Sequence, residues 1–101
     1  MEILLLCDNL MTNMPLRSAW EKAGHRVCAK PEAASAPEIV VVDLREKGGQ
    51  IAALRAQYPA AKIIAFGPHV DGDGLKQAKA EGADMAVARS AVVEKVLGAA
   101  A

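Results

Sequence analysis

Carboxylates stand directly after the two most apolar segments of the chain. Asp43 follows four consecutive β-branched residues, 39–42, and Asp8 follows the apolar run 3–7. Runs of this kind, without alternation of apolar and polar residues, are typical of parallel strands covered on both faces. Ligands of open α/β sheets bind beyond the carboxyl ends of such strands. Asp43 is therefore a candidate floor of a site, although a polar residue here also ends a strand and ties down its turn.

Cys7 offers a second kind of chemistry. It ends the first apolar run and precedes the N-terminus of a predicted helix, where a thiolate and a bound phosphate are both stabilised. A phosphocysteine enzyme is therefore a remote alternative. However, the loop 8–14 has no glycine, and Arg17 lies too far along for the phosphatase spacing of Cys, five residues, Arg.

Composition excludes several classes of protein. Twelve basic residues balance twelve acidic ones over 101 residues, which gives no charge signature for nucleic acid or an anionic membrane. The apolar runs are too short to span a bilayer, and the N-terminus does not resemble a signal peptide. Cys7 and Cys28 both fall in strand-like segments, which favours two reduced core thiols and a cytoplasmic protein.

The pattern predicts one α/β domain over residues 1–101, with five strands, four helices and no output domain. Trp20 lies on an apolar helical stripe and is expected in the core. Residues 30–37 hold two prolines and allow at most one helical turn between the second and third strands. We expect strands at 3–7, 26–29, 38–44, 62–67 and 84–88. We expect four helices: one from Thr12 or Asn13 to Gly24, a second that ends before Pro59, a third over 75–81, and a fourth from Ser90 to a frayed tail at 98–101. Asp71 and Asp73 are expected to be helix caps.

The order of elements and three local features resemble a known family. These features are the acidic step after the first strand, the Val-Val-Val-Asp-Leu segment 40–44, and the Glu-Gly-Ala-Asp segment 81–84. They resemble the receiver domain of bacterial response regulators, and the resemblance covers residues 2–97. It implies a flavodoxin-like, three-layer αβα fold with a five-stranded parallel sheet of order 2-1-3-4-5, here with the helix between strands 2 and 3 shortened or absent.

The resemblance also implies a set of functional positions. Receivers carry a phosphoryl group on the carboxylate that ends strand three, which matches Asp43. They hold Mg²⁺ with two acidic residues after strand one. Asp8 matches the first of these positions, whereas Asn9 stands at the second, where the family usually has an acid. The resemblance therefore implies Asp8 and Asp43 as the metal ligands. They also use a hydroxyl ending strand four and a Lys ending strand five, where this chain has Gly67 and Arg89.

These departures predict a degenerate pocket. Replacing an acid by Asn removes charge from a site for a hard cation, and Arg is not a neutral exchange for Lys. We expect Arg89 to pair with Asp43 or Asp8 in place of the cation. The expected function is a phosphorylation-independent module that binds a protein partner or forms a homodimer, with no enzymatic activity and no cofactor. The alternative is a single-domain regulator phosphorylated on Asp43 with Mg²⁺.

Overall fold

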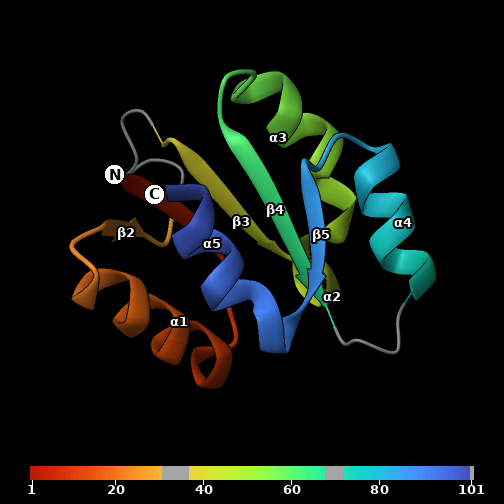
Figure 1. Cartoon of the computed structure of the whole chain (residues 1–101). Helices are drawn as coiled ribbons and strands as arrows, with labels where there is room; N and C mark the ends of the chain where they lie inside the picture. The colour runs from red at the N-terminus through yellow and green to blue at the C-terminus, as the bar shows by residue number, and fades with distance from the viewer. Residues whose placement is uncertain (31–36, 68–71, 101) are drawn as a thin grey trace.

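The computed structural model describes residues 1–30, 37–67 and 72–100. Five parallel strands form one sheet of order β2-β1-β3-β4-β5, as predicted (Figure 1). The expected shortening between strands two and three falls on residues outside the described ranges. The strands are β1 (Glu2–Leu6), β2 (Arg26–Cys28), β3 (Ile39–Asp43), β4 (Lys62–Gly67) and β5 (Met85–Ala88). The helices are α1 (Leu10–Lys22), α2 (Leu44–Lys47), α3 (Ile51–Gln57), α4 (Gly72–Ala80) and α5 (Val92–Ala100). Two 3₁₀ turns, η2 (Gly48–Gln50) and η3 (Arg89–Ala91), complete the described elements.

The helices cover the sheet on both faces. Alternate residues of β3 point to opposite sides, so that Val41 packs toward α1 and α5 while Val40 and Val42 pack toward α3 and α4. All four residues 39–42 are almost completely buried, and each contributes roughly 1.5–3 kcal/mol by leaving water. An unbroken apolar strand is therefore what a central position in this sheet requires.

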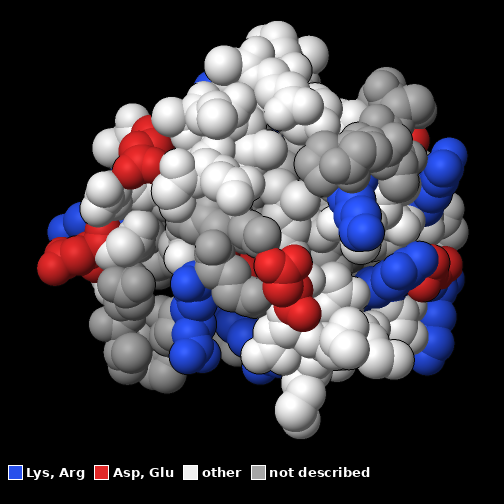
Figure 2. Space-filling model, turned by 180° about the vertical axis from the view of Figure 1, so that it is seen from behind, with Lys and Arg blue, Asp and Glu red and all other residues white. Residues whose placement is uncertain are grey.

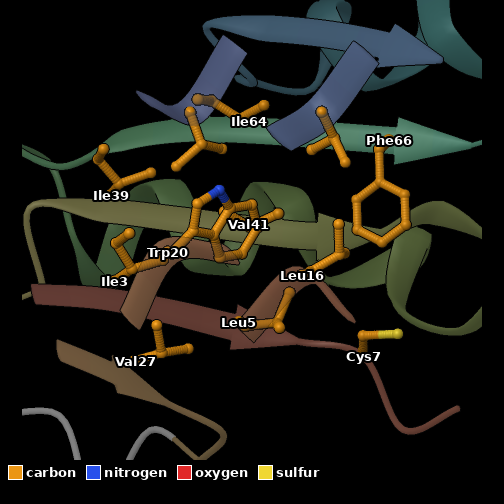
Figure 3. Close-up of a cluster of buried hydrophobic side chains, with 12 residues drawn as sticks. Ile3, Leu5, Cys7, Leu16, Trp20, Val27, Ile39, Val41, Ile64 and Phe66 are labelled. Atoms are coloured by element: carbon orange, nitrogen blue, oxygen red, sulfur yellow. The ribbon is translucent and has the colours of Figure 1, made fainter. Parts of the chain in front are cut away.

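The core on the α1 and α5 side is built around Trp20, as predicted. Its side chain is fully buried against β1 and β3, and its indole N–H donates to the Val93 carbonyl of α5 (Figure 3). Trp20 thus links the first and last helices across the same face of the sheet. Within the described residues, none of the helices is long and apolar enough to cross a membrane.

Several predicted boundaries were wrong. Strand β1 ends at Leu6 rather than Cys7, and α1 begins at Leu10 because Asn9, rather than Thr12 or Asn13, supplies its N-cap. Pro15 consequently lies inside α1 rather than in its first turn. The short strands β2 and β5 are each one residue shorter than expected, ending at Cys28 and beginning at Met85.

The later helices also differ from expectation. Helix α4 begins at Gly72, three residues early, so that Asp73 lies within its first turn rather than at the cap position; Asp71 lies outside the described residues. Ser90 lies within η3 rather than capping α5. The tail expected to fray is helical through Ala100, because α5 buries Val92 and Val96 against the sheet.

The amino ends of the strands lie at the edge of the sheet opposite their carboxyl ends. Met1 and Ala99 line one shallow depression there, together with Ile39 and Lys62. The start of the chain and the end of α5 therefore meet at this edge (Figure 1).

One arginine fastens the connection between α3, β4 and β5. The Arg55 guanidinium donates to the carbonyls of Tyr58, Pro59, Ala61 and Gly82 and pairs with the Asp84 carboxylate at 3.0 Å. Asp84 in turn accepts from the Ile63 N–H at 2.8 Å.

Gly82 is required by both its backbone and its surroundings. Its φ is +125°, and a Cβ added there would lie 3.0–3.1 Å from three side-chain carbons of Arg55. We expect Gly82→Ala to lower the free energy of unfolding by about 1–3 kcal/mol in urea denaturation. Gly98→Ala is the control, because Gly98 is helical with open space around it, and the variant should be as stable as the native chain or up to about 1 kcal/mol more stable. Equal losses in both variants would contradict this assignment.

The Asp84 carboxylate should make stability depend on acid pH. Burial raises the pKa of Asp84, but the Ile63 N–H, the Arg55 guanidinium and the Lys62 charge outweigh it and hold that pKa below its ordinary value. The carboxylate therefore stabilises the fold above the ordinary Asp range, near pH 4, and this contribution is lost as pH falls through the lowered pKa.

We expect Asp84→Asn to cost about 1 kcal/mol or less at neutral pH, since the side chain is 43% exposed and solvent screens it. The difference from the native chain should shrink as pH falls. Glu21→Gln, which breaks the exposed Arg17–Glu21 pair, is the control and should change stability by less than about 0.5 kcal/mol. A pH-independent loss in Asp84→Asn would count against the charged role of Asp84.

Candidate functional site

The carboxyl ends of four strands meet around Asp43. Leu6 is paired with Val42, so the next residues along, Cys7 and Asp43, come side by side. On the other side, Asp43 is paired with Phe66, and Gly67 with Ala88, which brings Arg89 to the same edge. The register of the sheet thus gathers residues that lie up to 82 positions apart in sequence, from Cys7 to Arg89.

A pocket of about 480 Å³ opens at this edge. It contains four of the five predicted site positions. Its lining residues are Asn9, Thr12, Asp43, Arg45, Phe66, Gly67 and Arg89. Asp8, the fifth position, is exposed and does not line the pocket, and Thr12 and Arg45 were not predicted.

The Asp43 carboxylate is buried, with 5% of the residue exposed, and both of its oxygens accept hydrogen bonds. Oδ1 accepts from the Arg45 N–H at 3.0 Å, and Oδ2 accepts from the Cys7 thiol at 3.3 Å. The first bond has N-cap geometry, because Arg45 is the second residue of α2. Asp43 therefore both lines the pocket and ties down the turn after its strand, so the two interpretations of its sequence position hold together.

Cys7 contacts Asp43 directly, which the sequence analysis did not foresee. Figure 3 shows its side chain just beyond the arrowhead of β1. The residue is 5% exposed, and its sulfur also lies 3.7 Å from the Asn9 carbonyl oxygen. A nucleophile for an external phosphate donor needs an open approach, and Cys7 is not among the pocket-lining residues. The geometry gives the phosphocysteine alternative no support.

Asn9 has a structural role in α1. Its side-chain oxygen accepts from the Met11 N–H at 3.0 Å, and its carbonyl accepts from the N–H groups of Thr12 and Asn13. The two residues that follow β1 are therefore Cys7 and Asp8, and Asn9 is the helix cap that comes after them.

Arg89 was predicted to pair with Asp43 or Asp8. No ion pair joins Arg89 to Asp43 among the described residues, where the oxygens of Asp43 accept from the Arg45 N–H and the Cys7 thiol. Over the same residues, no group of three or more His, Cys, Asp and Glu side chains is placed to hold a metal ion.

The cap assignment of Asn9 can be tested by two substitutions. We expect Asn9→Ala to lower the free energy of unfolding by about 0.5–2 kcal/mol, because it leaves a helical N–H without its acceptor. Asn9→Asp should be as stable as the native chain, since a carboxylate accepts the same bond. It should also gain no Mg²⁺ affinity in an NMR titration; a site at sub-millimolar Mg²⁺ in Asn9→Asp would show that Asn9 occupies a metal-ligand position instead.

Comparison with known proteins links this geometry to one family. No family model matches the chain, and no curated protein matches it. Among solved structures, a response regulator from Burkholderia pseudomallei, determined with a phosphorylated aspartic acid, calcium ion and citrate, is 29% identical over 95% of this chain with a TM-score of 0.81. This chain spans 64% of the length of that protein.

Two further solved structures agree with the first. A response regulator from Thermotoga maritima is 19% identical with a TM-score of 0.77, over 96% of this chain and 94% of its own. A receiver domain from Clostridium thermocellum is 17% identical with a TM-score of 0.79, over 97% and 92%. The strand order, the pocket at the carboxyl ends of the strands and these similarities together show that the chain has the fold of response-regulator receiver domains.

Proposed function

We propose that this receiver domain signals by binding another protein and that Asp43 does not act as a Mg²⁺-dependent phosphoacceptor. The observation that carries the proposal is the charge of the described residues that line the pocket: one acidic residue, Asp43, and two arginines, Arg45 and Arg89. Phosphorylation of a carboxylate needs its oxygen lone pairs and a cation beside it. Here each oxygen already accepts one hydrogen bond, and the positive charges of the two arginines in the lining repel a divalent cation.

The donor atoms at this edge do not fit Mg²⁺. A hard cation takes oxygen ligands and is held by carboxylates. We assign the two acidic positions after β1 to Cys7 and Asp8, which moves the assignment by one residue because β1 ends at Leu6. The first position then presents a thiol, a soft ligand, in direct contact with Asp43. We therefore propose that Asp8 and Asp43 do not form a magnesium site.

Gly67 lacks the hydroxyl that the family uses at this position, and crowding at Cβ does not explain the difference. A Cβ added at Gly67 would lie 3.5 Å and 3.7 Å from two carbons of Leu44, which is ordinary van der Waals contact.

The proposed partner surface is the exposed beginning of α1. Leu10, Met11 and Met14 are 68%, 85% and 64% exposed, and they flank Thr12 at the rim of the pocket. Exposed apolar groups that cluster in this way mark protein contacts, and methionine adapts to varied surfaces. On the face shown in Figure 2, acidic side chains lie among the basic ones, so that face carries no continuous basic surface of the kind that binds nucleic acid. A second copy of the chain is the simplest such partner, and a cytoplasmic location fits the two reduced thiols.

A phosphoacceptor is the second candidate function. The relative from Burkholderia pseudomallei carries a phosphorylated aspartic acid and a calcium ion. Asp43 ends β3 on the floor of the pocket, where such a modification would occur.

Incubation with acetyl phosphate and Mg²⁺, followed by intact-mass analysis, separates the two functions. We expect no phosphate adduct on the native chain. The combined variant Cys7→Asp, Gly67→Thr, Arg89→Lys restores the three family groups and should acquire an adduct, which should disappear when Asp43→Asn is added. An adduct on the native chain that is lost in Asp43→Asn would establish the second candidate and end the first.

A further inference from the structure

The pocket at the strand tips has the electrostatics of an anion site. Among the described residues that line it, Asp43 is negative, and Arg45 and Arg89 are positive, so these residues carry a formal charge of +1. A cation site at this place would need a negative balance. The first turn of α1 contains no acidic residue, although Asp8 precedes its N-cap, and the N-terminus of the helix adds a partial positive charge beside Thr12.

The negative charge of Asp43 is partly compensated within the protein. Its two oxygens accept from the Arg45 N–H and the Cys7 thiol, and the residue is 5% exposed. Hydrogen bonds to a charged acceptor are among the stronger ones. An anion in the pocket would therefore meet a carboxylate whose repulsion is reduced by these two donors.

The two guanidinium groups, in contrast, keep their donors available. Arg45 follows β3 and Arg89 follows β5, so they approach the pocket from opposite sides of β4 and its terminal Gly67. Both residues are exposed, and within residues 1–30, 37–67 and 72–100 neither side chain makes a hydrogen bond or an ion pair. Each guanidinium offers five N–H donors in a planar fork that matches the oxygens of phosphate.

We propose that the pocket binds a phosphate group non-covalently between Arg45 and Arg89, as an input that does not pass through phosphorylation of Asp43. Gly67, at the end of the strand between β3 and β5, adds no side chain of its own to the pocket lining. A volume of about 480 Å³ admits a small phosphorylated molecule as well as free phosphate. Binding would bridge the ends of β3 and β5 and place the ligand next to the exposed start of α1.

The probe is inorganic phosphate, titrated into the ¹⁵N-labelled native chain against sodium chloride at equal ionic strength. We expect saturable shifts that are confined to the pocket and include the Nε–Hε signals of Arg45 and Arg89, with none in chloride. Arg45→Gln and Arg89→Gln should each weaken binding about tenfold, because a charge-assisted pair of bonds is lost. Arg26→Gln removes the same charge at the start of β2, on the opposite edge of the sheet, and should bind like the native chain.

Asp43→Asn separates this proposal from the proposed function. Removing the carboxylate takes away repulsion, so the variant should bind phosphate more tightly, whereas it abolishes any covalent adduct from acetyl phosphate. The proposal fails if the shifts do not saturate, if chloride reproduces them, or if Arg26→Gln weakens binding as much as Arg89→Gln. It can hold even if the native chain proves to be a phosphoacceptor, because non-covalent binding is read in the absence of a phosphodonor.

Discussion

The buried carboxylate of Asp43 is the constraint around which the strand tips are arranged. A charged group that is 5% exposed must be hydrogen-bonded, since an unsatisfied one costs several kcal/mol. Its two donors come from different parts of the chain, the N–H of Arg45 in α2 and the thiol of Cys7 after β1. The same two bonds that make the fold tolerate this charge are made at a carboxylate that lines the pocket. One side chain therefore both completes the hydrogen bonding at the ends of the strands and contributes to the pocket.

The fold was predictable where the sequence carries continuous apolar runs. The segment 39–42 and its counterparts in β1 and β4 indicate buried parallel strands by themselves, whereas the strand order came from the family resemblance. Boundaries failed where a polar side chain decides them. Asn9 starts α1 earlier than Thr12 would, and the four-residue α2 is too short to show helical periodicity. The predicted start of α1 was too late because Pro15 was placed in the first turn of the helix, where proline is usually found.

The site was predictable in its residues more than in its contacts. Asn9, Asp43, Gly67 and Arg89 do line one pocket. However, the residue that follows β1 and lies beside Asp43 depends on where that strand ends. The predicted end of β1 was one residue too late, so that Cys7 was placed inside the strand and was not predicted to contact Asp43. Register is a property of strand pairing, set by contacts between residues such as Leu6 and Val42, and no local pattern in either strand specifies it.

The meeting of Met1 and Ala99 in one depression at the amino ends of the strands has a practical consequence. A short flexible linker could join the two ends without crossing the sheet, so the chain is suited to circular permutation, with new termini opened in the glycine turn at Gly48–Gln50. In such a permuted protein the connection between α2 and α3 would be cut while all five strands stay whole. Labels or fused domains could then be attached at the native termini, far from Arg45 and Arg89, or at the new termini of the permuted chain, which lie closer to these arginines.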